Sequence, residues 1–172
     1  IIVFNDNTTS NDDRLGAIGD IYFTIKKANI NDDILVLATD NLFDFELIDF
    51  YKFYKTKKAP CVCVREEDER TLRRLGVAKL DADNKIISFE EKPANPQGNY
   101  GVYAEYIYPK EVLGDIKEYL EEGNSSDAPG NLVAYIYQKM PTYAYAFSGV
   151  CYDVGTHDAL AYVNELYSRK NS

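Results

Sequence analysis

The feature that most constrains the fold is an apolar run at residues 33–39 (DILVLAT), which ends abruptly at Asp40 and Asn41. A short, continuous apolar run bounded by polar residues is typical of a strand buried on both faces, as in a parallel sheet. Further strands are predicted at residues 1–4 and 61–64, and the apolar spacing between the strands predicts one helix capped by Ser10 and another at residues 45–57. This alternation of strands and helices predicts an α/β fold with an open sheet.

The second half of the chain has shorter elements. The sequence predicts a hairpin from residues 76–80 and 85–89, a strand at 100–108, helices at 109–121 and around 132–136, strands at 142–147 and 151–153, and a last helix capped by Thr156. No linker or internal repeat interrupts these elements. We therefore expect residues 1–172 to form a single α/β domain, with an open mixed sheet that is mostly parallel and flanked by helices.

Charge and composition exclude some classes of partner. The chain has 172 residues, a formal net charge of −9 and a pI of about 4.6. Nucleic acids and anionic membranes both bind basic surfaces, so we expect neither as a partner. No apolar run approaches the roughly 20 residues that span a bilayer. The sequence contains 15 tyrosines, and those on predicted strands indicate packing or an interface, which leaves a homo-oligomer open.

Three cysteines, Cys61, Cys63 and Cys151, lack the spacing of a zinc site. Cys61 and Cys63 alternate along one predicted strand and therefore face one side of it. We interpret all three as buried free thiols in a reducing compartment, which predicts a cytoplasmic protein.

Two aspartates follow predicted strands. Asp40 comes directly after the apolar run, and Asp153 ends a later strand before Gly155 and Thr156. Ligands of open α/β sheets bind beyond the carboxyl ends of strands, and Mg²⁺ is often held by one or two carboxylates together with substrate phosphates. The alternative interpretation is that both aspartates are ordinary turn or cap residues.

A third candidate is the pair Glu91 and Lys92, which precedes Pro93 at the end of the predicted hairpin. Proline disfavours the helical region for the residue before it, so we expect Lys92 to leave the strand in an extended conformation. Its ammonium group would then be free to meet an anion, with Glu91 directed to the opposite face. The alternative is a solvated turn without a ligand.

Several short stretches occur in the order and spacing of one known family. They are SNDDRLGAIGD (residues 10–20), LATDNLF (37–43), LGV (75–77), FEEKPANP (89–96), SDAPGNL (126–132) and YDVGTHDAL (152–160). On these stretches the chain resembles the sugar-1-phosphate nucleotidylyltransferases, in particular the glucose-1-phosphate thymidylyltransferase-like branch. The resemblance implies a nucleotide-diphospho-sugar transferase-like fold and a role in nucleotide-sugar biosynthesis. The implied substrates are a nucleoside triphosphate and a sugar-1-phosphate, and the implied products are a nucleotide sugar and pyrophosphate.

The resemblance also implies roles for single residues. Asp40 and Asp153 match the aspartates that bind Mg²⁺ in the family. Glu91 matches the glutamate that holds sugar hydroxyls, and Lys92 the lysine that binds the sugar phosphate. Gly76 and Val102 match residues that line the sugar site, the glycine through its backbone. Asp40, Lys92 and Asp153 are therefore the expected catalytic residues.

The family's Gly-rich loop, which cradles the triphosphate, has no counterpart in this sequence. We therefore expect the chain to be the C-terminal, sugar-phosphate-binding portion of a nucleotidylyltransferase catalytic domain, lacking the first β-α elements and inactive alone. One alternative is a regulatory or scaffolding relative that binds sugar phosphate without catalysis. Another is a metal-dependent glycosyltransferase, but these use a D-x-D pair, whereas Asn41 and Leu42 follow Asp40.

Overall fold

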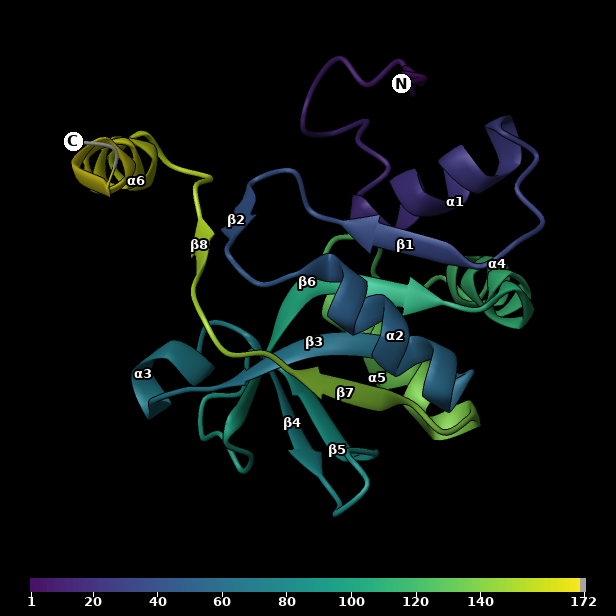
Figure 1. The fold of residues 1–172 in the computed structure, drawn as a ribbon. Helices are drawn as coiled ribbons and strands as arrows, with labels where there is room; N and C mark the ends of the chain where they lie inside the picture. The colour runs from purple at the N-terminus through teal and green to yellow at the C-terminus, as the bar shows by residue number, and fades with distance from the viewer. Residues whose placement is uncertain (171–172) are drawn as a thin grey trace.

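A computed structural model describes residues 1–170 (Figure 1). The strands are β1 (Ile34–Leu37), β2 (Asn41–Phe43), β3 (Cys61–Glu66), β4 (Gly76–Leu80), β5 (Ile86–Glu91), β6 (Tyr100–Tyr108), β7 (Tyr143–Ala146) and β8 (Cys151–Asp153). The helices are α1 (Ala17–Lys27), α2 (Leu47–Lys57), α3 (Glu69–Leu72), the 3₁₀ helix η1 (Lys110–Val112), α4 (Leu113–Glu121), α5 (Pro129–Lys139) and α6 (His157–Lys170).

The main sheet has six strands in the order β5-β4-β6-β3-β7, with β1 paired to β6 beside this path. A separate two-stranded sheet is formed by β2 and β8. The predicted α/β class and mixed sheet are confirmed, but the expectation that the sheet is mostly parallel is wrong. Among the strands described, only β3 and β7 pair in parallel. Short turns such as the one between β4 and β5 can join only antiparallel neighbours, since a parallel pair needs a crossover of a dozen residues or more.

Helices cover both faces of the main sheet (Figure 1). One core lies between the sheet and α1, α4 and α5, and it contains side chains such as Ile18, Ile116 and Leu132, all 0% exposed. A second core lies under α2, around Phe50, Cys61 and Cys63. The cysteines of β3 therefore share one buried face, as the alternation predicted.

Strand β1 differs from the expectation of a strand buried on both faces. Its burial alternates, with Ile34 and Val36 packed against the first core, whereas Leu35 and Leu37 are 47% and 37% exposed. It pairs with β6 alone among the described strands, so no second neighbour covers its outer edge. Apolar composition did not distinguish this half-exposed edge strand from a central one.

The N-terminal region also differs from what the sequence predicted. Residues 1–4 form no strand and are exposed. The carboxylate of Asp13 accepts hydrogen bonds from the backbone of Thr9 and Ser10, as in the predicted cap, but no helix follows there. The reason is Gly16, whose φ of 77° lies outside the helical region, so α1 begins only at Ala17.

Side-chain hydrogen bonds hold β1 in place. The Tyr54 hydroxyl of α2 donates to Asp33, which also accepts from the backbone of Lys110 at the start of η1, 3.0 Å away. The bond from Tyr54 lowers the pKa of Asp33, since it stabilises the carboxylate. These bonds anchor the strand that leads to Asp40.

The last helix begins as predicted. The Thr156 hydroxyl accepts a hydrogen bond from the backbone of Ala159 at 3.1 Å.

Within residues 1–170, no helix combines the length and the apolar character that crossing a bilayer requires.

Candidate functional site

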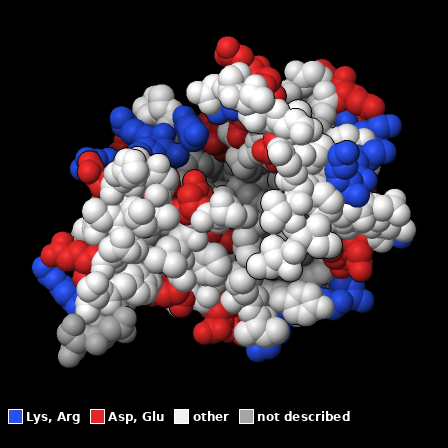
Figure 2. Space-filling view, turned by 90° about the horizontal axis from the view of Figure 1, so that it is seen from above, with Lys and Arg blue, Asp and Glu red and all other residues white. Residues whose placement is uncertain are grey.

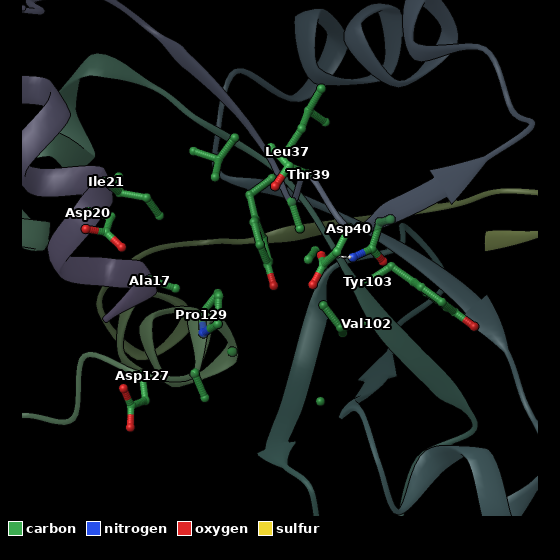
Figure 3. Close-up of a pocket in the computed structure, with 18 of the residues that line it drawn as sticks. Ala17, Asp20, Ile21, Leu37, Thr39, Asp40, Val102, Tyr103, Asp127 and Pro129 are labelled. Atoms are coloured by element: carbon green, nitrogen blue, oxygen red, sulfur yellow. Dashed lines mark hydrogen bonds between the residues drawn. The ribbon is translucent and has the colours of Figure 1, made fainter. Parts of the chain in front are cut away.

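A cavity of about 960 Å³ opens between the main sheet and the starts of α1 and α5. The space-filling view shows a hollow in this face of the molecule, with acidic side chains along it (Figure 2). Figure 3 shows Asp20 of α1 and Asp127, next to α5, on one side, with Asp40 and Val102 opposite. The predicted site residues all line this cavity, namely Asp40, Gly76, Glu91, Lys92, Val102 and Asp153. The structure thus brings together residues that are far apart in the sequence.

Asp40 and Asp153 are brought together by the two-stranded sheet. Asn41 pairs with Asp153 across the ladder, and the backbone nitrogen of Val154 donates to the carbonyl of Asp40 at 2.7 Å. A Cβ atom placed on Gly155 would lie 3.0 Å from Oδ1 of Asp153 and 3.5 Å from Oδ2 of Asp40. Both carboxylates therefore flank the same small space.

This donor set fits a hard divalent cation. Mg²⁺ takes oxygen ligands at about 2.0–2.1 Å and commonly uses one or two carboxylates, completing its shell with water and substrate phosphates. Asp40, directly before β2, and Asp153, the last residue of β8, supply two such groups. The described residues contain no cluster of three or more acidic, histidine or cysteine ligands, so a complete protein-made metal cage is absent from this part of the chain.

Glu91 lies deeper in the cavity. On β4, Gly76 pairs with Glu91 on one side and with Val102 on the other. The Glu91 carboxylate also fills space left by Gly130, because a Cβ there would lie within 1.8 Å of Oε2. Burial raises the pKa of Glu91. The two glycines thus leave room for one carboxylate between β4 and the start of α5.

Lys92 does not have the predicted extended conformation. Its φ is 45°, and its backbone nitrogen donates to the carbonyl of Leu75 at 3.0 Å. A positive φ is uncommon outside glycine and costs about 1–3 kcal/mol. It also breaks the strand alternation, so that Lys92 and Glu91 line the same cavity rather than opposite faces. The Lys92 side chain is 61% exposed and its Nζ lies 4.0 Å from Glu91, which leaves the ammonium available to an anion, as predicted.

Some cavity residues were not predicted. Arg74 lines the cavity next to Leu75 and has no side-chain hydrogen bond or ion pair within the described residues. Asp20 also faces the cavity, and burial raises its pKa. Asp127 forms an ion pair of 3.1 Å with Arg14 that joins the segments before α1 and α5. Asp20 and Asp127 lie within stretches that carried the family resemblance, which was the available signal for them.

A family profile described as nucleotidyl transferase matches residues 4–170. The chain belongs to the nucleotidyl transferase family. A glucose-1-phosphate adenylyltransferase from Fervidobacterium nodosum is 31% identical over 128 residues, which cover 72% of this chain and 30% of that protein.

Solved structures of similar fold support this membership. A protein from Bacillus anthracis described as a glucose-1-phosphate thymidylyltransferase, in complex with sucrose, has 26% identity and a TM-score of 0.72, covering 90% of this chain and 62% of that one. A UDP-glucose pyrophosphorylase with UDP-glucose has a TM-score of 0.76 at 20% identity, covering 90% and 63%, and shows the fold alone. This family member therefore spans less than two thirds of the length of each of these relatives.

Proposed function

We propose that the protein containing this chain transfers a nucleotidyl group from a nucleoside triphosphate to a sugar-1-phosphate and releases pyrophosphate. One observation carries the proposal: Asp40 and Asp153 share a single cavity with Glu91 and Lys92. Residues 1–172 are proposed to act as a single domain that supplies the metal and the sugar-phosphate side of the site. Mg²⁺ is the proposed metal and the cytoplasm the proposed location.

Each residue has a role that suits its chemistry. Glu91, inserted between Gly76 and Gly130, accepts hydrogen bonds from sugar hydroxyls, while Val102 and the Gly76 backbone shape the space around the ring. The ammonium of Lys92 neutralises the sugar phosphate and orients it. Asp40 and Asp153 hold the divalent ion, which neutralises phosphate charge when it is bound.

The reaction is an in-line displacement. An oxygen of the sugar phosphate attacks the α-phosphorus of the triphosphate, a new P–O bond forms, and the bond to the leaving pyrophosphate breaks. Phosphoryl-transfer reactions of this kind are accelerated mainly by positioning and charge neutralisation. In this proposal, Lys92 and a metal held by Asp40 and Asp153 would neutralise charge around the attacking phosphate.

Pyrophosphate release tests this function directly. The longest native protein that contains this chain is incubated with Mg²⁺, glucose-1-phosphate and each of ATP, dTTP, UTP, CTP and GTP in turn. We expect release with at least one triphosphate, and only when the sugar phosphate and the metal are both present. The isolated chain is expected to bind glucose-1-phosphate in calorimetry but to release no pyrophosphate, because its sequence has no Gly-rich phosphate loop. Sugar-phosphate binding without release by the longer protein would contradict catalysis and favour a regulatory relative.

Replacing Gly130 by alanine is expected to weaken glucose-1-phosphate binding by at least about tenfold, or about 1.4 kcal/mol. The new Cβ would lie 1.8 Å from Oε2 of Glu91 and would displace that carboxylate. The melting temperature should change little, because the displaced group is the end of a flexible side chain and alanine is favoured over glycine in a helix. Calorimetry and thermal unfolding measure the two effects.

The matched control is Gly114→Ala in α4, where a Cβ meets nothing within 4 Å. This variant should bind the sugar phosphate like the unmodified chain. Unchanged binding by Gly130→Ala would refute the role given to Glu91.

A further inference from the structure

The most unusual buried group in the structure is the carboxyl of Glu105 on β6. Its side chain is 0% exposed, and Oε2 has no hydrogen-bond partner among the described residues. A buried polar atom without a partner destabilises the fold, and an apolar side chain of similar size would avoid this penalty. The alternation of β6 places Glu105 on the face covered by the second core, beside Cys63. Packing alone therefore does not account for it.

A chain of polar contacts leads from Glu105 to the cavity. Its Oε1 lies 3.9 Å from Sγ of Cys151 on β8, and that sulfur lies 3.4 Å from Oδ1 of Asn41 on β2. The amide nitrogen of Asn41 then donates to Oδ1 of Asp40 at 2.9 Å, a bond drawn as a dashed line in Figure 3. The contacts thus connect the main sheet, the two-stranded sheet and the Asp40 carboxylate.

The direction of these bonds fixes the orientation of Asn41. A side-chain amide can present either its oxygen or its nitrogen to Asp40, and only the nitrogen can donate to a carboxylate. When the single thiol hydrogen of Cys151 is donated to Oδ1, the amide nitrogen must face Asp40. Oε1 of Glu105 contacts the same sulfur and fixes its position beside Asn41. Burial raises the pKa of Glu105 to about 7, so its carboxyl can lie in neutral form beside the thiol.

We propose that Glu105 is a positioning residue that acts through Cys151 and Asn41 to hold the Asp40 carboxylate in its orientation toward Asp153. The inference rests on the proposed function, because a fixed orientation of the Asp40 carboxylate matters only if Asp40 and Asp153 bind a metal. Groups that orient metal ligands are typically worth about 10- to 100-fold in metal affinity or activity. Glu105 then lowers the stability of the fold but supports the metal site.

The test measures metal affinity and stability in the same variants. Mn²⁺, which shares the oxygen preference of Mg²⁺, is titrated by electron paramagnetic resonance in the presence of glucose-1-phosphate, and thermal unfolding is recorded in parallel. Glu105→Leu and Cys151→Ala are each expected to weaken Mn²⁺ binding by about tenfold or more. Glu105→Leu should unfold at the same temperature as the unmodified protein or higher. Cys151→Ser keeps a donor and an acceptor at this position and should retain most of the affinity.

Cys61→Ala is the matched control. It removes a thiol from the same core, but the sulfur of Cys61 contacts the carbonyl of Ala59, 3.3 Å away, and has no path to Asp40. This variant should lose some stability and bind Mn²⁺ as the unmodified protein does. If Cys61→Ala also loses Mn²⁺ affinity in proportion to its loss of stability, the effect of the core substitutions is purely structural and the proposal is overturned.

The remaining outcomes separate this inference from the proposed function. If Asp40→Asn loses Mn²⁺ binding while Glu105→Leu and Cys151→Ala retain it, the positioning role is wrong and the metal site stands. If the unmodified protein binds no Mn²⁺, the metal site of the proposed function fails, and this inference fails with it.

Discussion

Replacing Asp40 or Asp153 by asparagine is expected to lower kcat/KM for nucleotidyl transfer by at least about a hundredfold. Each substitution preserves the size of the side chain but removes one of the two negative charges that flank Gly155. The metal is then held less tightly, and the phosphate charge that it would neutralise stays uncompensated in the transition state. The measurement is steady-state pyrophosphate release by the longest native protein that contains this chain, at fixed Mg²⁺.

The control for these variants is Asp158→Asn, at an exposed aspartate in the first turn of α6. It makes the same chemical change close to Asp153 in sequence but does not line the cavity, so its kcat/KM should match that of the unmodified protein. Near-normal rates in both Asp40→Asn and Asp153→Asn would refute the assignment of the metal site.

Replacing Lys92 by alanine is also expected to lower kcat/KM by at least about a hundredfold, for a different reason. The ammonium has Glu91 as its ion-pair partner at 4.0 Å and is largely exposed, so its loss should leave the stability of the fold almost unchanged. The sugar phosphate, however, loses the positive charge that balances it as it approaches the triphosphate. Activity with glucose-1-phosphate, Mn²⁺ affinity and the melting temperature together identify this effect.

Two comparisons sharpen the Lys92 result. At saturating glucose-1-phosphate, Lys92→Ala should retain the Mn²⁺ affinity of the chain, in contrast to the aspartate variants. Lys79→Ala removes an exposed lysine from the same hairpin outside the cavity and should be fully active. If Lys79→Ala and Lys92→Ala lose activity equally, general surface charge rather than a specific phosphate contact is responsible.

Local patterns in the sequence predicted many elements of the fold. Alternation and turn residues predicted β6 and the hairpin of β4 and β5, and capping chemistry predicted the start of α6 at Thr156. Each of these signals is local, because it depends on residues a few positions apart in the chain. The same local patterns did not predict whether neighbouring strands pair in parallel or antiparallel. The direction of pairing depends on which distant strand lies next to β1 or β3, and an apolar run such as residues 33–39 looks the same in either arrangement.

The candidate site was predicted mainly from motifs and their order. The spacing of those motifs indicated Asp40, Glu91, Lys92 and Asp153, and the structure places them around one cavity, whereas their roles stay predictions. The left-handed backbone of Lys92 was missed because the expected effect of Pro93 is an extended residue, and the tertiary contact with Leu75 overrides it.

Glu105 was missed for another reason. In an alternating strand, an acidic residue is usually read as pointing to solvent, but both faces of β6 are covered by apolar cores. Tyr103 and Ile107, two positions to either side of Glu105, are buried in the second core. Apolar neighbours at that spacing were the signal in the sequence that Glu105 is buried as well.

The short ladder of β2 and β8 fixes the positions of the two aspartates relative to each other. Its register matches Asn41 with Asp153, and the segment beyond it is closed by Asp44, whose side chain accepts from the backbone of Val150 at 2.7 Å. A slip of one residue along such a ladder would turn one carboxylate to the other face. A change in the length of a loop outside the ladder would therefore leave the two carboxylates together, whereas one residue inserted within the ladder would separate them.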